Sequence, residues 1–115
     1  MTGASGPDGA PSGETVAYKI LTADQWAAFQ AAGEFAGAPI DLADGYIHMS
    51  AAAQLQGTLE AHFAGQSGLV IATIDLAPLG DDVVWEASRG GALFPHLYYR
   101  SLPLSVVTET RIVDT

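Results

Sequence analysis

The sequence contains no cysteine, which excludes a disulfide framework, a thiolate metal site and a cysteine nucleophile. It contains no apolar run approaching the roughly 18 to 20 residues of a membrane span. The N-terminal residues also lack the basic and apolar regions of a signal peptide. These absences predict a cytoplasmic protein without membrane contact.

Basic residues are scarce, since Lys and Arg total 4 against 13 Asp and Glu, for a net charge of -9 at pH 7. Binding to nucleic-acid phosphates needs a basic face, so we expect no nucleic-acid partner. Arg89 and Arg100 bracket a segment that contains His96, where a local pocket for one small anion could form. Ordinary ion pairing with neighbours such as Glu86 explains these arginines equally well.

The order of sequence patterns predicts the fold class. At 115 residues, 49% of them hydrophobic, the chain suits one compact domain. Residues 1–14 are rich in Gly, Pro, Ser and Ala and predict a disordered tail, which leaves 15–115 as the domain. A strand, a helix, a strand, a helix and then several strands indicate an α+β domain with a mostly antiparallel sheet.

The expected elements follow from composition and spacing. We expect strands at 16–21, 46–49, 69–76, 83–87, 93–99 and 105–113, and helices at 23–32 and 51–64. Thr22 and Gln25 suit a capping box for the first helix, and Trp26 and Phe29 suit its core face. The nearly continuous apolar run at 69–76 predicts the central strand, whereas Pro39 and residues 78–82 indicate loops or turns.

Residues 44–50, DGYIHMS, predict a turn, a short strand and, from Ser50, the capped start of the second helix. Strand alternation places Ile47 and Met49 in the core and turns His48 to the other face. Beside the free N–H groups of a helix start, His48 could contact a ribose hydroxyl or phosphate oxygen, or act as an acid or base. Alternatively, His48 joins two strands through a backbone carbonyl.

A second cluster of polar residues follows in 85–91 and 94–100. Glu86 lies in an otherwise apolar strand, where an unpaired buried carboxylate would be costly, so it is either paired or exposed. Arg89 precedes two glycines in a loop that suits an anion clamp, and His96 follows a proline in an extended segment. Together these residues indicate a binding site.

Two common kinds of catalytic site are disfavoured. His48, His62 and His96 are the only histidines, and their spacing matches no local metal-ligand pattern, so we predict no metal site. His62 lies at the edge of a helical core stripe and suits a structural role. The serines lack the sequence context of a nucleophile elbow, which argues against a serine triad.

Several motifs, taken in order, resemble domain-of-unknown-function family 952 from about Tyr18 to Val107. They are Tyr-Lys-Ile, a helix with Trp26, Asp-Gly-Tyr-Ile-His-Met-Ser, Gln54, Trp-Glu-Ala-Ser-Arg-Gly-Gly and Phe-Pro-His-Leu-Tyr. The resemblance implies an ADP-ribosyltransferase-like fold, in which a small split sheet with two main helices holds NAD in a cleft. The strand with His48 is also similar to one in the RNA 2'-phosphotransferase branch of that fold.

The resemblance also implies roles for individual residues. His48 and Glu86 would be the catalytic groups, with Ser50, Arg89, His96 and Tyr98 binding the ligand. In this interpretation His48 contacts a ribose or phosphate, Arg89 holds phosphate, and Tyr98 or Tyr99 stacks on a base. NAD is the implied cofactor or substrate, although the residues alone leave the cofactor unknown.

Three interpretations of the domain stay open. It is a nucleotide-handling enzyme of the transferase type, or a non-catalytic module that binds a small anionic metabolite or a protein with the same cleft. A purely structural domain would instead have both His48 and His96 buried and hydrogen-bonded, with no cleft between them.

Overall fold

The structure is a computed structural model that describes residues 14–87 and 91–115. Its strands are β1 Val16–Leu21, β2 Glu34–Phe35, β3 Tyr46–His48, β4 Leu69–Asp75, β5 Val83–Ala87, β6 Leu93–Tyr98, β7 Leu102–Pro103 and β8 Val107–Val113. Its α-helices are α1 Ala23–Ala32, α2 Pro39–Asp44 and α3 Leu55–His62, and its 3-10 helices are η1 Ala52–Gln54, η2 Ala77–Asp82 and η3 Leu104–Val106. The predicted tail lies almost entirely outside the described residues.

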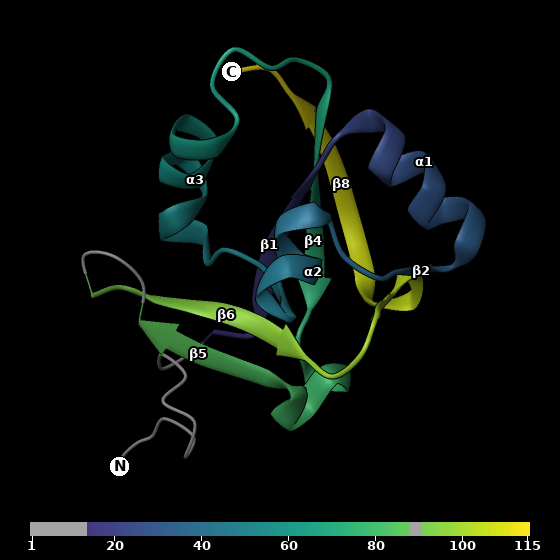
Figure 1. The fold of residues 1–115 in the computed structure, drawn as a ribbon, viewed down its shortest axis with the longest axis vertical. Coiled ribbons are helices and arrows are strands. Elements are labelled where there is room, and N and C mark those ends of the chain that lie inside the picture. The colour runs from purple at the N-terminus through teal and green to yellow at the C-terminus, as the bar shows by residue number, and fades with distance from the viewer. Residues whose placement is uncertain (1–13, 88–90) are drawn as a thin grey trace.

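The strands form two three-stranded antiparallel sheets, β1-β4-β8 and β3-β6-β5, and a two-stranded ladder of β2 with β7. An isolated bridge between Tyr18 and Ser50 connects β1 to the chain just after β3. Figure 1 shows β5 and β6 crossing below the upright strands β1, β4 and β8, with α1 and α3 on opposite sides of those strands. The α+β class and the antiparallel pairing are therefore confirmed.

Strand β4 is the centre of the first sheet, as its apolar sequence predicts. It pairs with β1 on one edge and β8 on the other, and five of its seven side chains are buried. Ile71 packs with Leu55 and Leu59 beneath α3, whereas Ile74 belongs to the larger cluster that contains Phe29 of α1. Burial on both faces explains the absence of alternation in this strand.

The start of α1 is also as predicted. The Gln25 N–H donates to Thr22 Oγ1 at 3.1 Å, and the Thr22 N–H donates to Gln25 Oε1 at 2.9 Å. Gly33 ends the helix with φ of 79°, in the left-handed region that glycine tolerates. Phe29 is buried and meets the edge of Trp26 at 5.5 Å between ring centroids, so this pair belongs to the core.

The prediction for the second helix was wrong at both ends, because α3 spans Leu55–His62 and is preceded by η1. Ser50 does not cap it. The N-cap of η1 is Ala51, whose backbone N–H donates a hydrogen bond to Gln54 Oε1 at 2.9 Å. Ser50 lies in extended chain, where backbone hydrogen bonds to Tyr18 hold it.

The segment that begins at Pro39 is helix α2 rather than a loop. Pro39 occupies the first helical position, where its missing N–H costs nothing, and Gly45 ends the helix with φ of 86°. Asp44 is therefore the last residue of a helix and not part of a simple turn. A six-residue helix is too short to show an amphipathic period, which explains why the pattern was missed.

Smaller differences concern the C-terminal half. Residues 77–82 form η2 where a turn was expected, and η3 replaces the first part of the final strand. Strand β8 is also more exposed than predicted, since residues 108–112 all lie at the surface. Among the described residues, no helix combines the length and the hydrophobicity that crossing a membrane requires.

Candidate functional site

The sheet β3-β6-β5 has one apolar face and one polar face. Ile47, Trp85 and Leu97 are buried on the apolar face. Alternation along the paired strands places the other side chains together, with Tyr46 opposite Tyr98 and His48 opposite His96. We call this group the histidine face; it comprises Tyr46, His48, Glu86, His96 and Tyr98.

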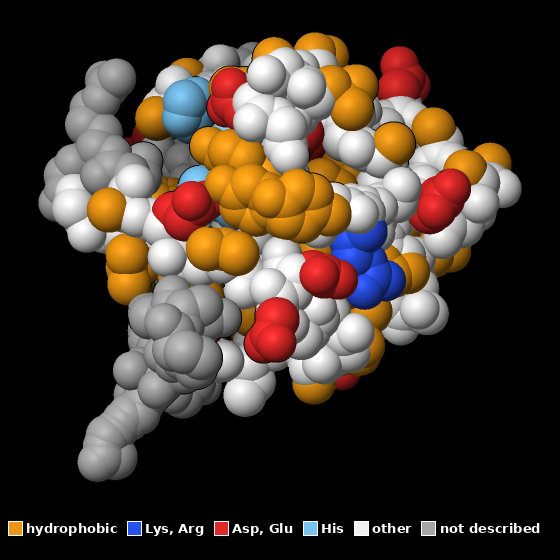
Figure 2. Space-filling view, turned by 60° about the horizontal axis from the view of Figure 1, so that its bottom comes forward, with side chains coloured by type: hydrophobic (Ala, Val, Ile, Leu, Met, Phe, Trp, Pro, Cys, Tyr) orange, Lys and Arg blue, Asp and Glu red, His pale blue; other side chains and the backbone are white. Residues whose placement is uncertain are grey.

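The rings of the histidine face are in mutual contact. The Tyr46 ring stacks on His96 at 4.2 Å between centroids, and lies 4.7 Å from His48 and 5.0 Å from Tyr98. The His48 and His96 rings are 5.4 Å apart at an interplanar angle of 70°. Figure 2 shows histidine, acidic and hydrophobic side chains gathered together on one part of the surface. The four rings therefore form one aromatic patch that carries carboxylates at its margin.

Glu86 is the hydrogen-bond acceptor of this face. Its Oε1 lies 2.6 Å from the Tyr98 hydroxyl and 2.7 Å from His96 Nδ1. These two hydrogen bonds lower the pKa of Glu86, and the Glu86 carboxylate raises the pKa of Tyr98 to about 12. Burial lowers the pKa of His96 despite the opposing effect of Glu86. Since an ionised carboxylate only accepts, His96 Nδ1 must carry the proton.

His48 is held by two carboxylates of α2. Its Nδ1 lies 2.6 Å from Asp41 Oδ1, and its Nε2 lies 2.9 Å from Asp44 Oδ2. The spacing of three residues places Asp41 and Asp44 on one side of the helix. Both ring nitrogens are therefore already engaged within the protein.

Asp41 extends this network into the interior. It is almost fully buried and pairs with Lys19, whose Nζ lies 3.0 Å from Oδ2 and also donates to the His48 carbonyl at 2.8 Å. Burial alone would raise the pKa of Asp41, but the Lys19 charge and the donors from His48 and Ala38 lower it overall. Burial lowers the pKa of Lys19, against the opposing effect of Asp41. One carboxylate thus joins β1, α2 and β3.

The structure brings four of the six predicted site residues together: His48, Glu86, His96 and Tyr98. Ser50 is buried, its hydroxyl lies 3.1 Å from Thr58 Oγ1 of α3, and among the described residues it forms no hydrogen bond with the other predicted site residues. Arg89 lies outside the described residues. Ser50 thus links β1 and α3, through its backbone hydrogen bonds to Tyr18 and the contact of its hydroxyl with Thr58.

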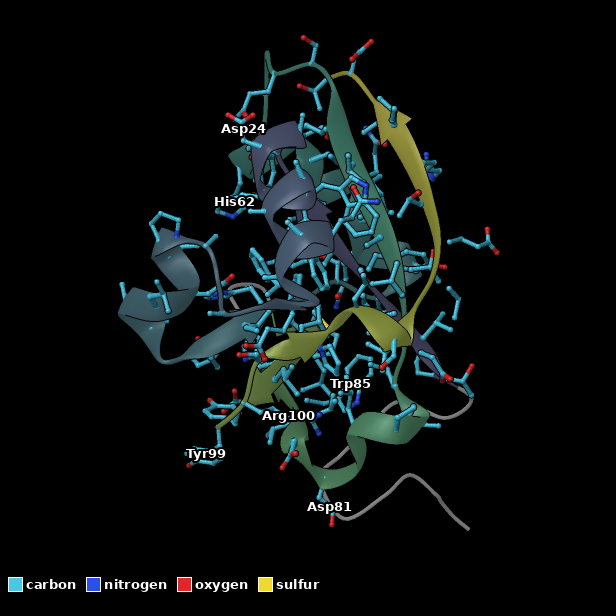
Figure 3. All side chains as sticks on the ribbon, turned by 90° about the vertical axis from the view of Figure 1, so that its right-hand side faces the viewer. Asp24, His62, Asp81, Trp85, Tyr99 and Arg100 are labelled. Carbon is cyan, nitrogen blue, oxygen red and sulfur yellow. The ribbon has the colours of Figure 1, made fainter. Side chains whose placement is uncertain are left out.

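Tyr99, the other predicted stacking residue, follows the end of β6. It is 93% exposed and has φ of 64°, a left-handed backbone conformation that is uncommon for a residue with a side chain. Figure 3 shows Tyr99 projecting outward at the end of the strand, away from Trp85. Tyr98, in contrast, keeps its ring against Tyr46.

Four residues of the site were not predicted from the sequence: Lys19, Asp41, Asp44 and Tyr46. A lysine in the middle of the apolar strand 16–21 was one available signal, because a buried charge requires a partner. The second signal was the spacing of the two aspartates. The predicted helix start beside His48 is replaced by the acidic side of α2.

Neither of two surface pockets coincides with the histidine face. The first, of about 320 Å³, lies on the β1-β4-β8 sheet, and the second, of about 230 Å³, lies between α1, η3 and β8. Within residues 14–87 and 91–115, no three His, Asp or Glu side chains are grouped so as to hold a metal ion. The histidine face offers hydrogen-bonding and stacking groups.

Comparisons with known proteins place the chain in a family. Residues 20–110 match the family model described as "Protein of unknown function (DUF952)". A crystal structure of protein CC0527 from Caulobacter crescentus is 51% identical in sequence, with a TM-score of 0.83 and 87% of each chain covered. The solution NMR structure of CC0527 is 50% identical, with a TM-score of 0.77 over 88% of this chain and 86% of that one.

A crystal structure of a double mutant of CC0527 is 50% identical, again with a TM-score of 0.83 and 87% of each chain covered. No curated protein matches the chain. The family model spans most of the domain, and the agreement with CC0527 extends to the arrangement of the strands and helices. The chain therefore belongs to the DUF952 family of proteins of unknown function.

Proposed function

We propose that the histidine face binds a nucleotide or another phosphate-bearing small molecule of the NAD or ADP-ribose kind, on an ADP-ribosyltransferase-like domain. The observation that carries the proposal is Glu86, an ionised carboxylate held by two donors within a patch of aromatic rings. Such a carboxylate accepts hydrogen bonds from ribose hydroxyls, and aromatic rings stack on bases.

Three polar side-chain atoms of the histidine face have no side-chain partner among the described residues: the Tyr46 hydroxyl, Glu86 Oε2 and His96 Nε2. Both hydrogen bonds to Glu86 use Oε1, so Oε2 has no side-chain partner among the described residues. His96 likewise uses only Nδ1, which leaves Nε2 as an acceptor. The Glu86 side chain is 39% exposed, so a ribose hydroxyl can reach it from solvent. The phosphate contact in this proposal stays with Arg89.

In the catalytic form of the proposal, Glu86 and His48 act on the bound nucleotide. Glu86 has a carboxylate oxygen without a side-chain partner among the described residues. Its lowered pKa keeps it ionised, which suits an acceptor of hydroxyl hydrogen bonds that orients the nucleotide rather than a base that takes up a proton. A transfer reaction would need His48 to release Asp41 or Asp44, since both of its nitrogens are engaged.

The contacts of both His48 ring nitrogens with Asp41 and Asp44 favour a second candidate function, a module that binds its ligand without turnover. A histidine with both nitrogens on carboxylates holds α2 against β3 and transfers no proton while those contacts last. In this form Glu86 and the aromatic rings recognise the ligand, and His48 shapes the surface.

Thermal unfolding with NAD, ADP-ribose, AMP and 5'-phosphorylated RNA ends tests the binding proposal. A ligand that binds only the folded state stabilises it by about 2.7 kcal/mol at a hundredfold excess over the dissociation constant. We expect a raised midpoint in the wild type, lost in Glu86→Ala and His48→Ala but kept in the matched control Glu60→Ala on α3. A wild type that none of these ligands stabilises would contradict the proposal.

The Glu86→Gln variant distinguishes the catalytic form of the proposal from the binding module, because it keeps the shape of the side chain and removes its charge. If the domain is an enzyme, wild type releases nicotinamide or a transfer product from the ligand that stabilises it, and Glu86→Gln binds that ligand without forming product. Product formation is followed by chromatography over hours. A wild type that binds the ligand but forms no product in that time would establish the binding module.

A further inference from the structure

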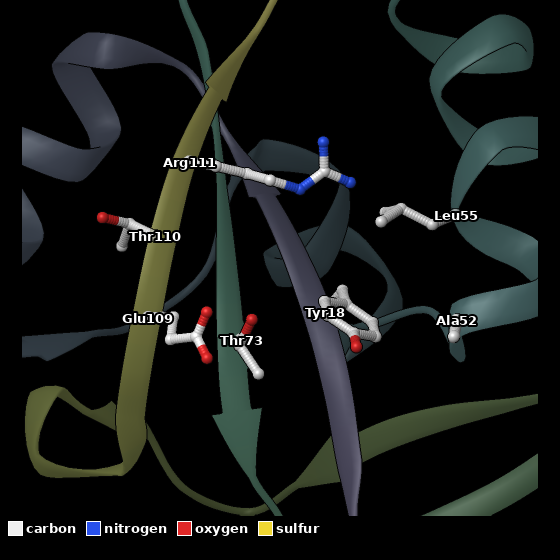
Figure 4. A pocket seen from close by; sticks show the side chains of 7 residues that line it. All are labelled: Tyr18, Ala52, Leu55, Thr73, Glu109, Thr110 and Arg111. Atoms are coloured by element: carbon white, nitrogen blue, oxygen red, sulfur yellow. The ribbon is translucent and has the colours of Figure 1, made fainter.

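A separate pocket of about 320 Å³ lies between α3 and the sheet β1-β4-β8. We call it the α3 pocket. Figure 4 shows side chains from β1, β4 and β8 on one side and from η1 and α3 on the other. Its lining includes Tyr18, Ala52, Leu55, Thr73, Glu109 and Arg111. None of these residues belongs to the histidine face.

The strand register explains why the polar lining residues meet. Thr73 of β4 pairs with Tyr18 on one side and with Glu109 on the other. Arg111 is two residues beyond Glu109 and therefore points to the same face of the sheet. Figure 4 shows Arg111 extended across β1 toward Leu55, with Glu109 and the Thr73 hydroxyl further along the sheet.

The polar side chains of the α3 pocket lack partners within the part of the chain that the structure describes. The hydroxyls of Tyr18 and Thr73 take part in no side-chain hydrogen bond there, and neither Glu109 nor Arg111 forms an ion pair. The histidine face differs, because most of its polar atoms are already paired. Unpaired groups that converge on a pocket are available to a ligand.

The α3 pocket is lined by one acidic and one basic side chain, Glu109 and Arg111. Residues two apart on a strand are separated by about 6.8 Å, so Glu109 and Arg111 can contact two ends of one small molecule. A guanidinium binds a carboxylate through paired hydrogen bonds, and a carboxylate binds an ammonium group. Leu55 supplies an apolar wall, continuous with the buried cluster beneath α3.

We propose that the α3 pocket binds a small zwitterion, namely a free α-amino acid with an apolar side chain. Arg111 holds its carboxylate, Glu109 holds its ammonium group, and Leu55 contacts its side chain. The hydroxyls of Tyr18 and Thr73 complete the polar contacts. A pocket near the small end of the usual range of about 300 to 1,000 Å³ suits such a molecule, and Glu109 disfavours a phosphate.

NMR titration of the full chain tests this proposal, with leucine as the probe. Leucinamide lacks the carboxylate, and 4-methylpentanoate lacks the ammonium group, so each omits one predicted contact. We expect saturable shifts of the backbone amides of Leu55, Thr73 and Arg111 with leucine, and affinities weaker by about tenfold or more with either analogue. No shift of these amides at millimolar leucine would overturn the proposal.

Variants supply the second part of the test. Arg111→Gln and Glu109→Gln should each weaken leucine binding by about tenfold or more. Arg100→Gln removes the same charge at the end of β6 and should bind as the wild type does. Because Glu109 and Arg111 are exposed, their variants should keep the wild-type melting midpoint. Unchanged leucine affinity in Arg111→Gln would overturn the proposal, whatever nucleotides do at the histidine face.

Discussion

Asp41 is the residue on which the polar network of the domain converges. Its two oxygens accept from Lys19 Nζ, from the backbone N–H groups of Ala38 and His48, and from the His48 ring. A carboxylate that is only 2% exposed is tolerable because these donors replace the water that it loses. Lys19 is equally dependent on Asp41, since it too is buried.

Lys19→Met should therefore be strongly destabilising, although methionine suits an apolar strand. Removing one partner leaves the buried Asp41 charge without compensation, which costs about 3 to 5 kcal/mol in comparable pairs. Urea denaturation at neutral pH measures the loss. The exposed pair of Arg100 with Asp82 is the control, because Arg100→Gln should change the free energy of unfolding by less than about 1 kcal/mol. Equal effects of the two variants would contradict this account of Asp41.

At the scale of elements, the ladder of β5, β6 and β3 creates the histidine face. Glu86 of β5 reaches His96 and Tyr98 of β6, which in turn face His48 and Tyr46 of β3. A register slip of one residue would move every second side chain to the core face. The buried positions of Ile47 and Leu97 therefore fix the arrangement of the polar groups as well.

This ladder predicts a specific titration. Glu86→Gln removes the charge that raises the pKa of Tyr98 from its ordinary 10.0 to about 12, so that pKa should fall toward 10.0. Carbon NMR of the labelled tyrosine rings follows it directly, and Glu60→Gln should leave it at about 12.

The sign of the stability effect follows from the same shift. A group whose pKa is raised in the folded state contributes stability that is present below its unfolded pKa and is lost as pH rises through its folded pKa. The Tyr98 contribution should thus disappear between pH 10.0 and about 12 in the wild type, and be smaller in Glu86→Gln, where burial of Tyr98 still raises its pKa. An unchanged Tyr98 titration in this variant would contradict the assigned cause.

At the scale of the whole molecule, the β1-β4-β8 sheet separates two hydrophobic clusters. The larger one joins α1 to the second sheet, and the smaller one, beneath α3, contains Ile20, Leu55, Leu59, Leu69 and Ile71. Helix α3 is thus held by few buried side chains. It should open more readily than β4, which is paired on both edges.

Leu59→Ala tests this division of the core. Leucine-to-alanine changes at buried sites cost about 2 to 5 kcal/mol of unfolding free energy, and here the loss should include faster hydrogen exchange in α3 than in β4. Leu42→Ala is a matched control, because Leu42 is 65% exposed on α2. Similar exchange rates in α3 and β4 of the Leu59 variant would show that α3 and the sheet unfold as one unit.

The strands and the first helix were largely predictable, because their signals are local. The capping box of Thr22 and Gln25 spans three residues, and the apolar run of β4 is continuous. Helix α2 and the start of α3 were not. Their few turns carry little periodicity, and contacts with distant strands stabilise them.

The sequence by itself predicted the burial of Ile47 and Met49 and the turn of His48 to the other face. It also indicated four members of the histidine face. Only the tertiary structure decided that His48 meets His96, that Lys19 meets Asp41, and that Arg111 and Tyr18 line a separate pocket. These contacts join residues far apart in the chain, and they depend on strand register and on the cost of burying charge, which no local pattern encodes.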